Sequence, residues 1–177
     1  MIKSTKPTNY IADHLSASQQ QELLDNATLT FHKRNATIDA AAHPCCYYIL
    51  LEGVCYYGHS EGAIYRFSFP GSFLHVHESH NVRITTATPV VLAQVSKDDF
   101  KRIIGDTDFD VMLYRLHLKD LQTMLFLSKL SIPQQIKWLY AHKYPQHLPV
   151  TLLARFIGVS PQFFHRIRKQ QGESQYN

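Results

Sequence analysis

The sequence has few cysteines and no long apolar run. Its 177 residues include three cysteines, two of them adjacent, with no C-x-x-C spacing. An odd number in this arrangement argues against a disulfide framework and a zinc site, so we expect a reduced, cytoplasmic protein. The N-terminus lacks a basic start followed by an apolar run, and no window approaches the roughly 18 apolar residues of a membrane span. We therefore expect neither secretion nor a membrane.

Motifs of common enzyme classes are also missing. The sequence shows no nucleophile elbow, no phosphate-binding loop and no paired-carboxylate motif, so we expect no enzyme and no cofactor. It shows no internal repeat and no low-complexity segment. With 45% apolar residues the chain can bury a core, and its length suits one domain or a medium domain plus a small one.

Basic residues are concentrated near the C-terminus. The net charge is +4, but residues 1–130 hold 12 Lys and Arg against 13 Asp and Glu, whereas residues 131–177 hold 6 against 1. A basic excess confined to one quarter of a chain is typical of a nucleic-acid-binding module.

The most specific pattern covers residues 151–169 and predicts a helix-turn-helix. Gly158 suits the turn, because a residue just past a helix end often needs positive φ. Ser160 is placed to cap the second helix, and Pro161 to occupy its first turn. Apolar residues spaced by three and four give the first helix one buried face: Leu152, Leu153, Phe156 and Ile157.

The second helix carries long polar side chains and no acid on its outer face, formed by Gln162, His165, Arg166 and Lys169. Such a face suits base edges and phosphates. The alternative is an ordinary helical hairpin with a basic surface.

The first half of the chain is dominated by strand patterns. Short β-prone runs bounded by Gly and Pro predict an antiparallel barrel or sandwich. A capped helix over 16–25 precedes them. The expected strands are 28–32, 46–51, 54–57, 63–69, 73–77, 82–86 and 90–95.

Helical periodicity returns after Ser96, which with Asp99 predicts a helix N-terminus. From 109 to 130 the apolar residues Val111, Tyr114, Leu118, Leu121 and Leu125 step by 3, 4, 3 and 4, as in a heptad seam. This helix is expected to pack against a second subunit; the alternative is one broad core face in a monomer. A further helix is expected from 132 to 144.

Three stretches resemble Crp/Fnr-type transcriptional regulators: Tyr48–Val54, Phe69–Phe73, and Tyr144–Thr151 through to Lys169. The resemblance covers about residues 20–170. It implies an α+β fold with an N-terminal antiparallel β-roll of the cyclic-nucleotide-binding type, a long dimerisation helix and a C-terminal helix-turn-helix. The implied domains are 1–130, including the dimerisation helix at about 97–130, and 131–177.

The resemblance also assigns roles in binding double-stranded DNA as a homodimer through the 109–130 helix, on a near-palindromic operator. Ser160 caps the recognition helix, Gln162 and Arg166 occupy base-reading positions, and Arg168 and Lys169 contact phosphates. His165 lies on the same face. Gln162 stands where many members have glutamate, so the base preference is expected to differ.

The sensor half departs from cyclic-nucleotide-binding relatives. Gly71 is followed by Ser72 where they carry glutamate, and Arg83 is followed by Ile84 where they carry Ser or Thr. We therefore predict no binding of cyclic AMP or cyclic GMP, and an effector, if one exists, is an unidentified small molecule.

A histidine cluster offers the main alternative function. His75 and His77, two apart on a strand, would share a face, and His80 follows closely. These residues could make a metal- or haem-binding sensor, or a cupin-like metal enzyme. The simpler interpretation is surface or hydrogen-bonded imidazoles without a metal.

Overall fold

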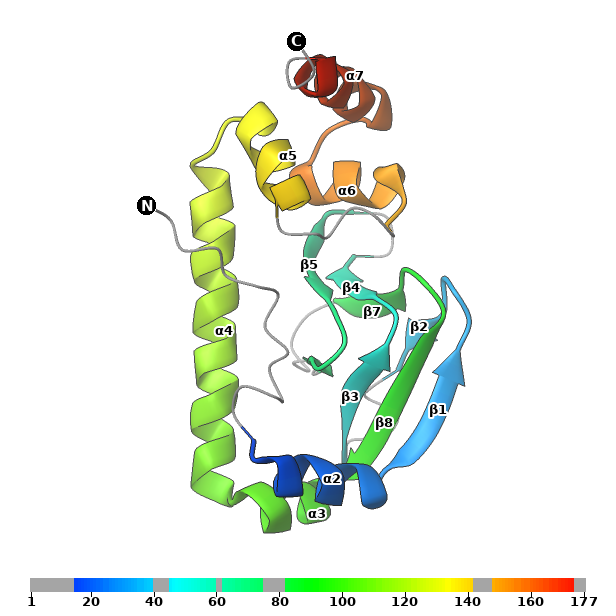
Figure 1. The fold of residues 1–177 in the computed structure, drawn as a ribbon, viewed down its shortest axis with the longest axis vertical. Coiled ribbons are helices and arrows are strands. Elements are labelled where there is room, and N and C mark those ends of the chain that lie inside the picture. The colour runs from blue at the N-terminus through cyan, green and yellow to red at the C-terminus, as the bar shows by residue number, and fades with distance from the viewer. Residues whose placement is uncertain (1–14, 40–44, 60–61, 75–81, 142–147, 174–177) are drawn as a thin grey trace.

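The computed structural model describes residues 15–39, 45–59, 62–74, 82–141 and 148–173. Two antiparallel sheets lie in the middle of the molecule, with helices at both ends and one long helix alongside (Figure 1). The α+β class and the antiparallel roll predicted from the sequence are confirmed.

Each sheet has four antiparallel strands. The first sheet has the order β1-β8-β3-β6, and the second has the order β2-β7-β4-β5. Strands that are distant in the chain therefore lie side by side, as in a roll. The bounds are β1 Thr28–His32, β2 Thr37–Ile38, β3 Cys46–Glu52, β4 Cys55–Gly58, β5 Ile64–Ser68, β6 Phe73–Leu74, β7 Arg83–Thr86 and β8 Val90–Ser96.

Glycine turns separate the strands much as the sequence predicts. Gly53 has φ +84, and a Cβ there would lie 2.2 Å from the carbonyl oxygen of Pro89. That turn therefore needs glycine for both its conformation and its space. Strand β2, whose two residues pair with β7, is not predicted by the sequence.

The core is built in layers because strand side chains alternate between faces. Tyr48 and Leu50 of β3 point between the two sheets, whereas Ile49 packs outward against helices. In β4, Cys55 and Tyr57 likewise face the interior while Tyr56 faces out. The two sheets therefore bury apolar side chains on their outer faces as well as between them.

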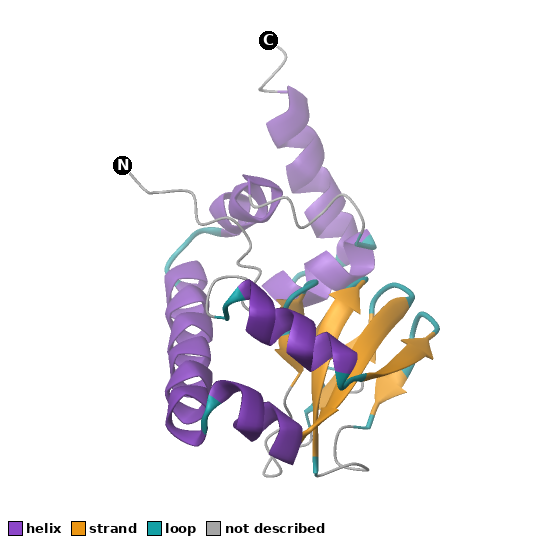
Figure 2. Ribbon diagram, turned by 60° about the horizontal axis from the view of Figure 1, so that its bottom comes forward, coloured by secondary structure: helices purple, strands orange, loops and turns teal. Residues whose placement is uncertain are grey.

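Helices α2, Ala17–Asp25, and α3, Lys97–Ile104, pack together against the outer face of the first sheet (Figure 2). Ser16 begins α2 with a capping box in which Gln19 takes part, and the hydroxyl of Ser96 accepts from the backbone N–H of Asp99. Both helix starts lie where the sequence predicts them.

The stretch 97–130, expected to be one dimerisation helix, is two helices. Gly105, with φ +89 and ψ 144, ends α3, and α4 then runs from Asp106 to Ser128. A residue in that conformation cannot continue a helix, and glycine adopts it at little cost. Helix α4 extends beside the sheets from α3 at one end to α5 at the other (Figure 1).

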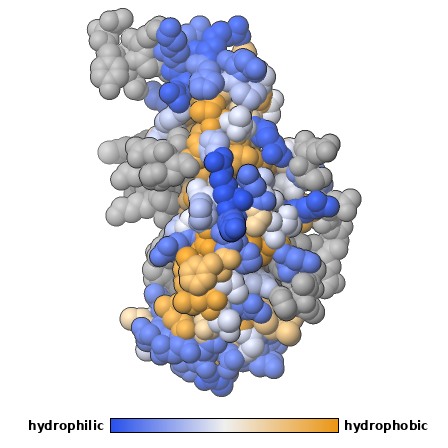
Figure 3. Space-filling model, turned by 90° about the vertical axis from the view of Figure 1, so that its right-hand side faces the viewer, coloured by the Kyte–Doolittle hydropathy of each residue, from blue (hydrophilic) through white to orange (hydrophobic). Residues whose placement is uncertain are grey.

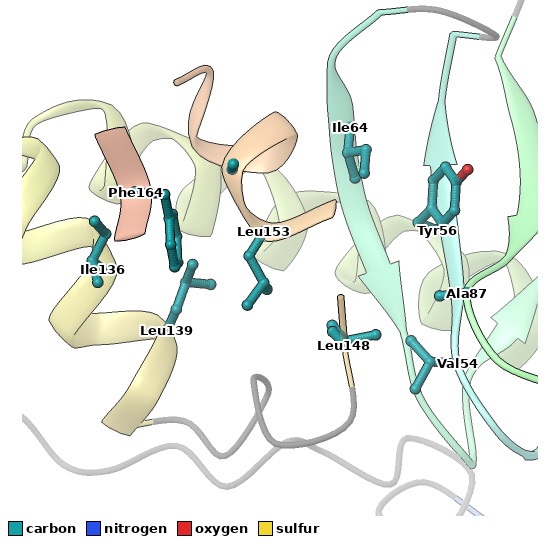
Figure 4. Close-up of a cluster of buried hydrophobic side chains, with 10 residues drawn as sticks. Val54, Tyr56, Ile64, Ala87, Ile136, Leu139, Leu148, Leu153 and Phe164 are labelled. Atoms are coloured by element: carbon teal, nitrogen blue, oxygen red, sulfur yellow. The ribbon is translucent and has the colours of Figure 1, made fainter. Parts of the chain in front are cut away.

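Helices α5, Ile132–Ala141, α6, Val150–Ile157, and α7, Pro161–Glu173, lie at the end of the molecule opposite α2 and α3 (Figure 1). They pack on one another, and α6 packs on β5 of the second sheet. The resulting cluster, here called the shared core, combines sheet residues with helix residues (Figure 4): Val54, Tyr56, Ile64, Ala87, Ile136, Leu139, Leu148, Leu153, Ala154 and Phe164.

The outer face of the first sheet is covered only in part. Leu29 and Phe31 of the edge strand β1 are 51% and 75% exposed, and Figure 3 shows apolar surface on the side of the molecule that carries this strand. Within the described residues, no helix combines the length and the apolarity needed to cross a membrane.

Candidate nucleic-acid interface

The turn between α6 and α7 has the geometry that its sequence predicts. Gly158 adopts the left-handed conformation, with φ 80 and ψ 31. The N–H of Val159 then donates to the carbonyl of Ala154 at 2.9 Å, and the N–H of Gly158 donates to Arg155 at 3.3 Å. These bonds satisfy carbonyls that the end of a helix leaves without partners. A Cβ on Gly158 would meet no atom within 4 Å, so only backbone conformation requires glycine there.

Ser160 caps α7. Its hydroxyl oxygen accepts from the N–H of Phe163 at 3.2 Å, and its carbonyl accepts from Phe164 at 3.0 Å. Pro161 is the first residue of the helix, where no intrahelical N–H bond is needed. Phe164 is completely buried in the shared core. The cap sets where α7 begins, and the phenyl ring sets which face turns inward.

That inward face determines which side chains reach solvent. Gln162, Arg166 and Lys169 lie on the side of the helix opposite Phe164, with His165 beside them, and all four are exposed. Arg168 is also exposed, but it lies four residues after Phe164 and therefore nearer the buried side. The structure thus brings the predicted residues onto one exposed helix, with Arg168 at the margin.

Arg166 is positioned by an aromatic neighbour. Its guanidinium carbon lies 4.8 Å from the centre of the Phe163 ring, one turn earlier on the helix. Stacking on the ring restricts the long side chain without using its N–H donors. The Arg166 guanidinium is therefore well suited to donate two parallel hydrogen bonds to a planar group that carries two acceptors.

Arg155 of α6 makes a contact that the sequence analysis missed. Its Nη2 and Nε donate to the carbonyl oxygen of Gly62 at 2.8 and 3.3 Å, and its guanidinium lies 6.0 Å from the Tyr56 ring centre. Phe156, next to it, packs its ring 5.3 Å from that of Phe67 on β5. Helix α6 is thus held against the second sheet by aromatic contacts and against the segment just before β5 by polar ones.

Ser72, which stands where cyclic-nucleotide-binding relatives carry glutamate, takes part in a turn of the sensor half. The turn 69–72 is tied to β3, because Gly71 donates to the carbonyl of Leu50 and Leu50 donates to that of Ser72. The Ser72 hydroxyl accepts from the N–H of Phe69 at 3.3 Å. Arg83 begins β7 and is exposed. The absence of cyclic-nucleotide binding remains a prediction.

The alternative metal site lies outside the described residues, because His75, His77 and His80 all fall in 75–81. Among the residues that the structure does describe, no group of three or more His, Cys, Asp and Glu side chains is placed to hold a metal ion.

Comparison with known proteins gives matches in structure and not in sequence. No family model and no curated protein matches the sequence. Among solved structures, FixK2 from Bradyrhizobium japonicum has a TM-score of 0.68 at 16% identity, covering 84% of this chain and 86% of its own. The c-di-GMP-responsive global regulator CLP of Xanthomonas campestris has a TM-score of 0.58 at 17% identity, covering 90% and 93%.

A protein from Eubacterium rectale described as a Crp/Fnr-family transcriptional regulator is also similar. It has a TM-score of 0.61 at 16% identity and covers 94% of this chain and 89% of its own. Because these likenesses span most of both chains, they include the roll, the long helix and the C-terminal helices together. The chain therefore has the fold of Crp/Fnr-type regulators.

Proposed function

We propose that the chain is a sequence-specific DNA-binding transcriptional regulator of the Crp/Fnr type that acts as a homodimer and not as an enzyme. The observation that carries this proposal is the exposed polar face of α7, held outward by the buried Phe164 and free of acidic side chains from Pro161 to Gln170. The shared fold supports it, because regulators of this type read DNA with the corresponding helices.

The side chains on α7 divide into two roles. Gln162 and Arg166 project from the N-terminal part of the helix, which enters the major groove in helix-turn-helix proteins. Glutamine favours adenine and arginine favours guanine, because each can make a paired contact with that base. Lys169 and Arg168 lie further along and suit phosphates, which fix position and carry no sequence information. His165 flanks the same face.

The proposed dimer interface is the α4 stripe, the set of residues that forms the heptad seam. Its members are 39 to 65% exposed within one chain: Val111, Tyr114, Leu118, Leu121 and Leu125. Such an apolar row along one helix marks an interaction surface in a soluble protein. Burial against a second α4 would remove it from water, and each leucine would contribute roughly 1.5–3 kcal/mol.

A two-fold dimer sets the form of the operator. The two copies of α7 would enter successive major grooves about 34–36 Å apart and read a near-palindrome. An effector would act by binding one arrangement of the two α7 helices more tightly than another.

The test is selection of bound duplexes from a random DNA pool with the purified full chain. We expect an enriched palindrome with half-sites about one helical turn apart. A parallel selection with Arg166→Ala should retain the spacing and lose preference at one base pair of each half-site. Absence of DNA binding at low salt would refute the proposal, since phosphate contacts are strongest there.

A further inference from the structure

Two cysteine side chains meet at one end of the roll. Cys45 lies in the turn just before β3, and Cys46 is the first residue of that strand. Their Sγ atoms are 3.9 Å apart, with Cys45 exposed and Cys46 partly buried. The third cysteine, Cys55, is buried in the roll, where desolvation raises the pKa of its thiol to about 12. Only the pair formed by Cys45 and Cys46 is accessible to a reagent from solution.

The spacing of this pair suits a shared soft atom. Two sulfurs bound at about 2.3 Å to one pyramidal trivalent centre, with an angle of about 100° between the bonds, lie about 3.5 Å apart. A disulfide would instead require the sulfurs to approach to about 2.05 Å. The observed 3.9 Å therefore needs a much smaller movement of the sulfurs for chelation than for oxidation.

The number of sulfur donors limits the kinds of ligand that Cys45 and Cys46 can bind together. Gln94 Nε2 donates a hydrogen bond to Cys46 Sγ at 3.3 Å, which restrains the position of that sulfur. No third ligand accompanies the pair among the described residues. A bare zinc ion wants four ligands, and the soft ions that bind only two thiolates do so almost linearly, which would hold the sulfurs well beyond the observed 3.9 Å. Trivalent arsenic that already carries one organic group needs only two sulfurs.

We propose that Cys45 and Cys46 form a dithiol site that captures a mono-organic trivalent arsenical. In the reaction with an arsine oxide, two arsenic–sulfur bonds form and the arsenic–oxygen bond breaks. The oxygen leaves as water with the two thiol protons, and no atom changes oxidation state. This site is independent of the DNA-binding proposal and lies at the opposite end of the molecule from α7 (Figure 1).

The site is connected directly to the start of α3. The carbonyl of Cys45 accepts from the N–H of Lys97, the first residue of α3, at 2.8 Å. Cys46 pairs with Ser96 across the sheet, and Ser96 caps α3. Fixing both sulfurs on one atom restrains the backbone that carries this carbonyl. Capture is therefore expected to change the protection of the Lys97 amide.

The test uses phenylarsine oxide on the reduced full chain, followed by intact-mass and peptide analysis. We expect one phenylarsenic group per chain, located on the peptide that contains Cys45 and Cys46. Because the second arsenic–sulfur bond forms within one molecule, removal from the native chain should need on the order of a hundredfold more monothiol than removal from Cys45→Ser or Cys46→Ser. Cys55→Ala is the matched control and should keep the full effect.

A second readout follows hydrogen exchange of the Lys97 amide with and without the arsenical. We expect its exchange rate to change, while amides of α7 keep theirs. Equal sensitivity of native and single-cysteine variants to monothiol would overturn the dithiol site, as would an adduct located on Cys55. Unchanged exchange at Lys97 would overturn the link to α3.

Discussion

The shared core and the α4 stripe are both apolar, but one is buried within the chain and the other is not. Phe164, Leu153 and Ile136 in the shared core are at most 1% exposed, whereas Tyr114 and Leu125 of the α4 stripe are 65% and 62% exposed. The first surface joins α7 to the roll through α5 and α6. The α4 stripe is the surface through which we propose that the chain associates with another copy. The proposed DNA-reading helix is thus fixed by intrachain packing, and its partner copy would be fixed by α4.

The shared core and the α4 stripe also differ in how far apart in the sequence their residues lie. The shared core combines sheet residues such as Ile64 with helix residues such as Leu153, which are about 90 positions apart, and beside it Arg155 donates to the carbonyl of Gly62. The residues of the α4 stripe all lie on one helix, three or four positions apart in the sequence. Changes to the first should therefore alter folding of one chain, and changes to the second should alter association of two.

The largest effect is expected from charges in the α4 stripe. The double change Leu121→Asp and Leu125→Asp removes two leucines from the proposed interface, each worth roughly 1.5–3 kcal/mol. The dimer dissociation constant should rise by at least about a hundredfold, because 1.4 kcal/mol corresponds to a factor of ten. Sedimentation equilibrium measures this constant.

The matched control for that change is Gln122→Asp with Arg115→Gln, two exposed positions of the same helix that lie off the seam and together change the net charge by the same two units. It adds the same charge and should leave association nearly unchanged. A native chain that sediments as a monomer at high concentration would contradict the role of the stripe.

The next effect is expected from Phe164→Ala in the shared core. Removing a fully buried phenyl ring costs roughly 3–5 kcal/mol of unfolding free energy, because a cavity is left where packing was complete. Urea denaturation followed by Trp138 fluorescence would measure it. Phe163→Ala, on the partly exposed side of the same helix, should cost clearly less. Equal losses for the two variants would show that α7 is not anchored through Phe164.

A smaller effect is expected from Arg155→Met, which removes both bonds to the Gly62 carbonyl. Hydrogen bonds from a charged donor contribute about 1.5–3 kcal/mol, so the unfolding free energy should fall by about that amount. Arg168→Met, at an exposed position, should change it by no more than about 0.5 kcal/mol. If the two variants are equally stable, the contact between α6 and the second sheet contributes nothing to the fold.

The smallest differences separate base reading from phosphate contact on α7. Arg166→Ala should cost about 1–3 kcal/mol on the selected operator and relax preference at one base pair. Lys169→Ala should weaken binding to all sequences alike and reduce the salt slope by about one. Titrations at several salt concentrations, on matched and mismatched duplexes, measure both. An equal loss on all duplexes for Arg166→Ala would make it a phosphate contact.

Structural features that depend only on neighbouring residues could be predicted from the sequence. Gly158 and Ser160 identify the turn and the cap because their roles depend on neighbouring residues alone, and the structure confirms both. The exposed α4 stripe follows from spacing along one helix in the same way. These local features are sufficient to identify the candidate interface from the sequence alone.

Contacts between distant segments were not predictable in this way. Arg155 reads in the sequence as one more cation of the basic region, and only the fold brings it to Gly62. Thr86 similarly looks like an ordinary strand residue, yet its buried hydroxyl donates to the carbonyl of Lys33 at 2.7 Å. The break at Gly105 was not predicted, because a single glycine in an expected helical stretch does not by itself mark a helix end.

In the proposed function, two chains joined through α4 read one operator together. The most direct measurement is the stoichiometry and affinity of the complex on the selected palindrome and on an isolated half-site, by native mass spectrometry and titration. We predict two native chains per palindrome, with much weaker binding to the half-site, and loss of that difference in the Leu121→Asp, Leu125→Asp variant. One native chain binding the half-site as tightly as the palindrome would contradict the account.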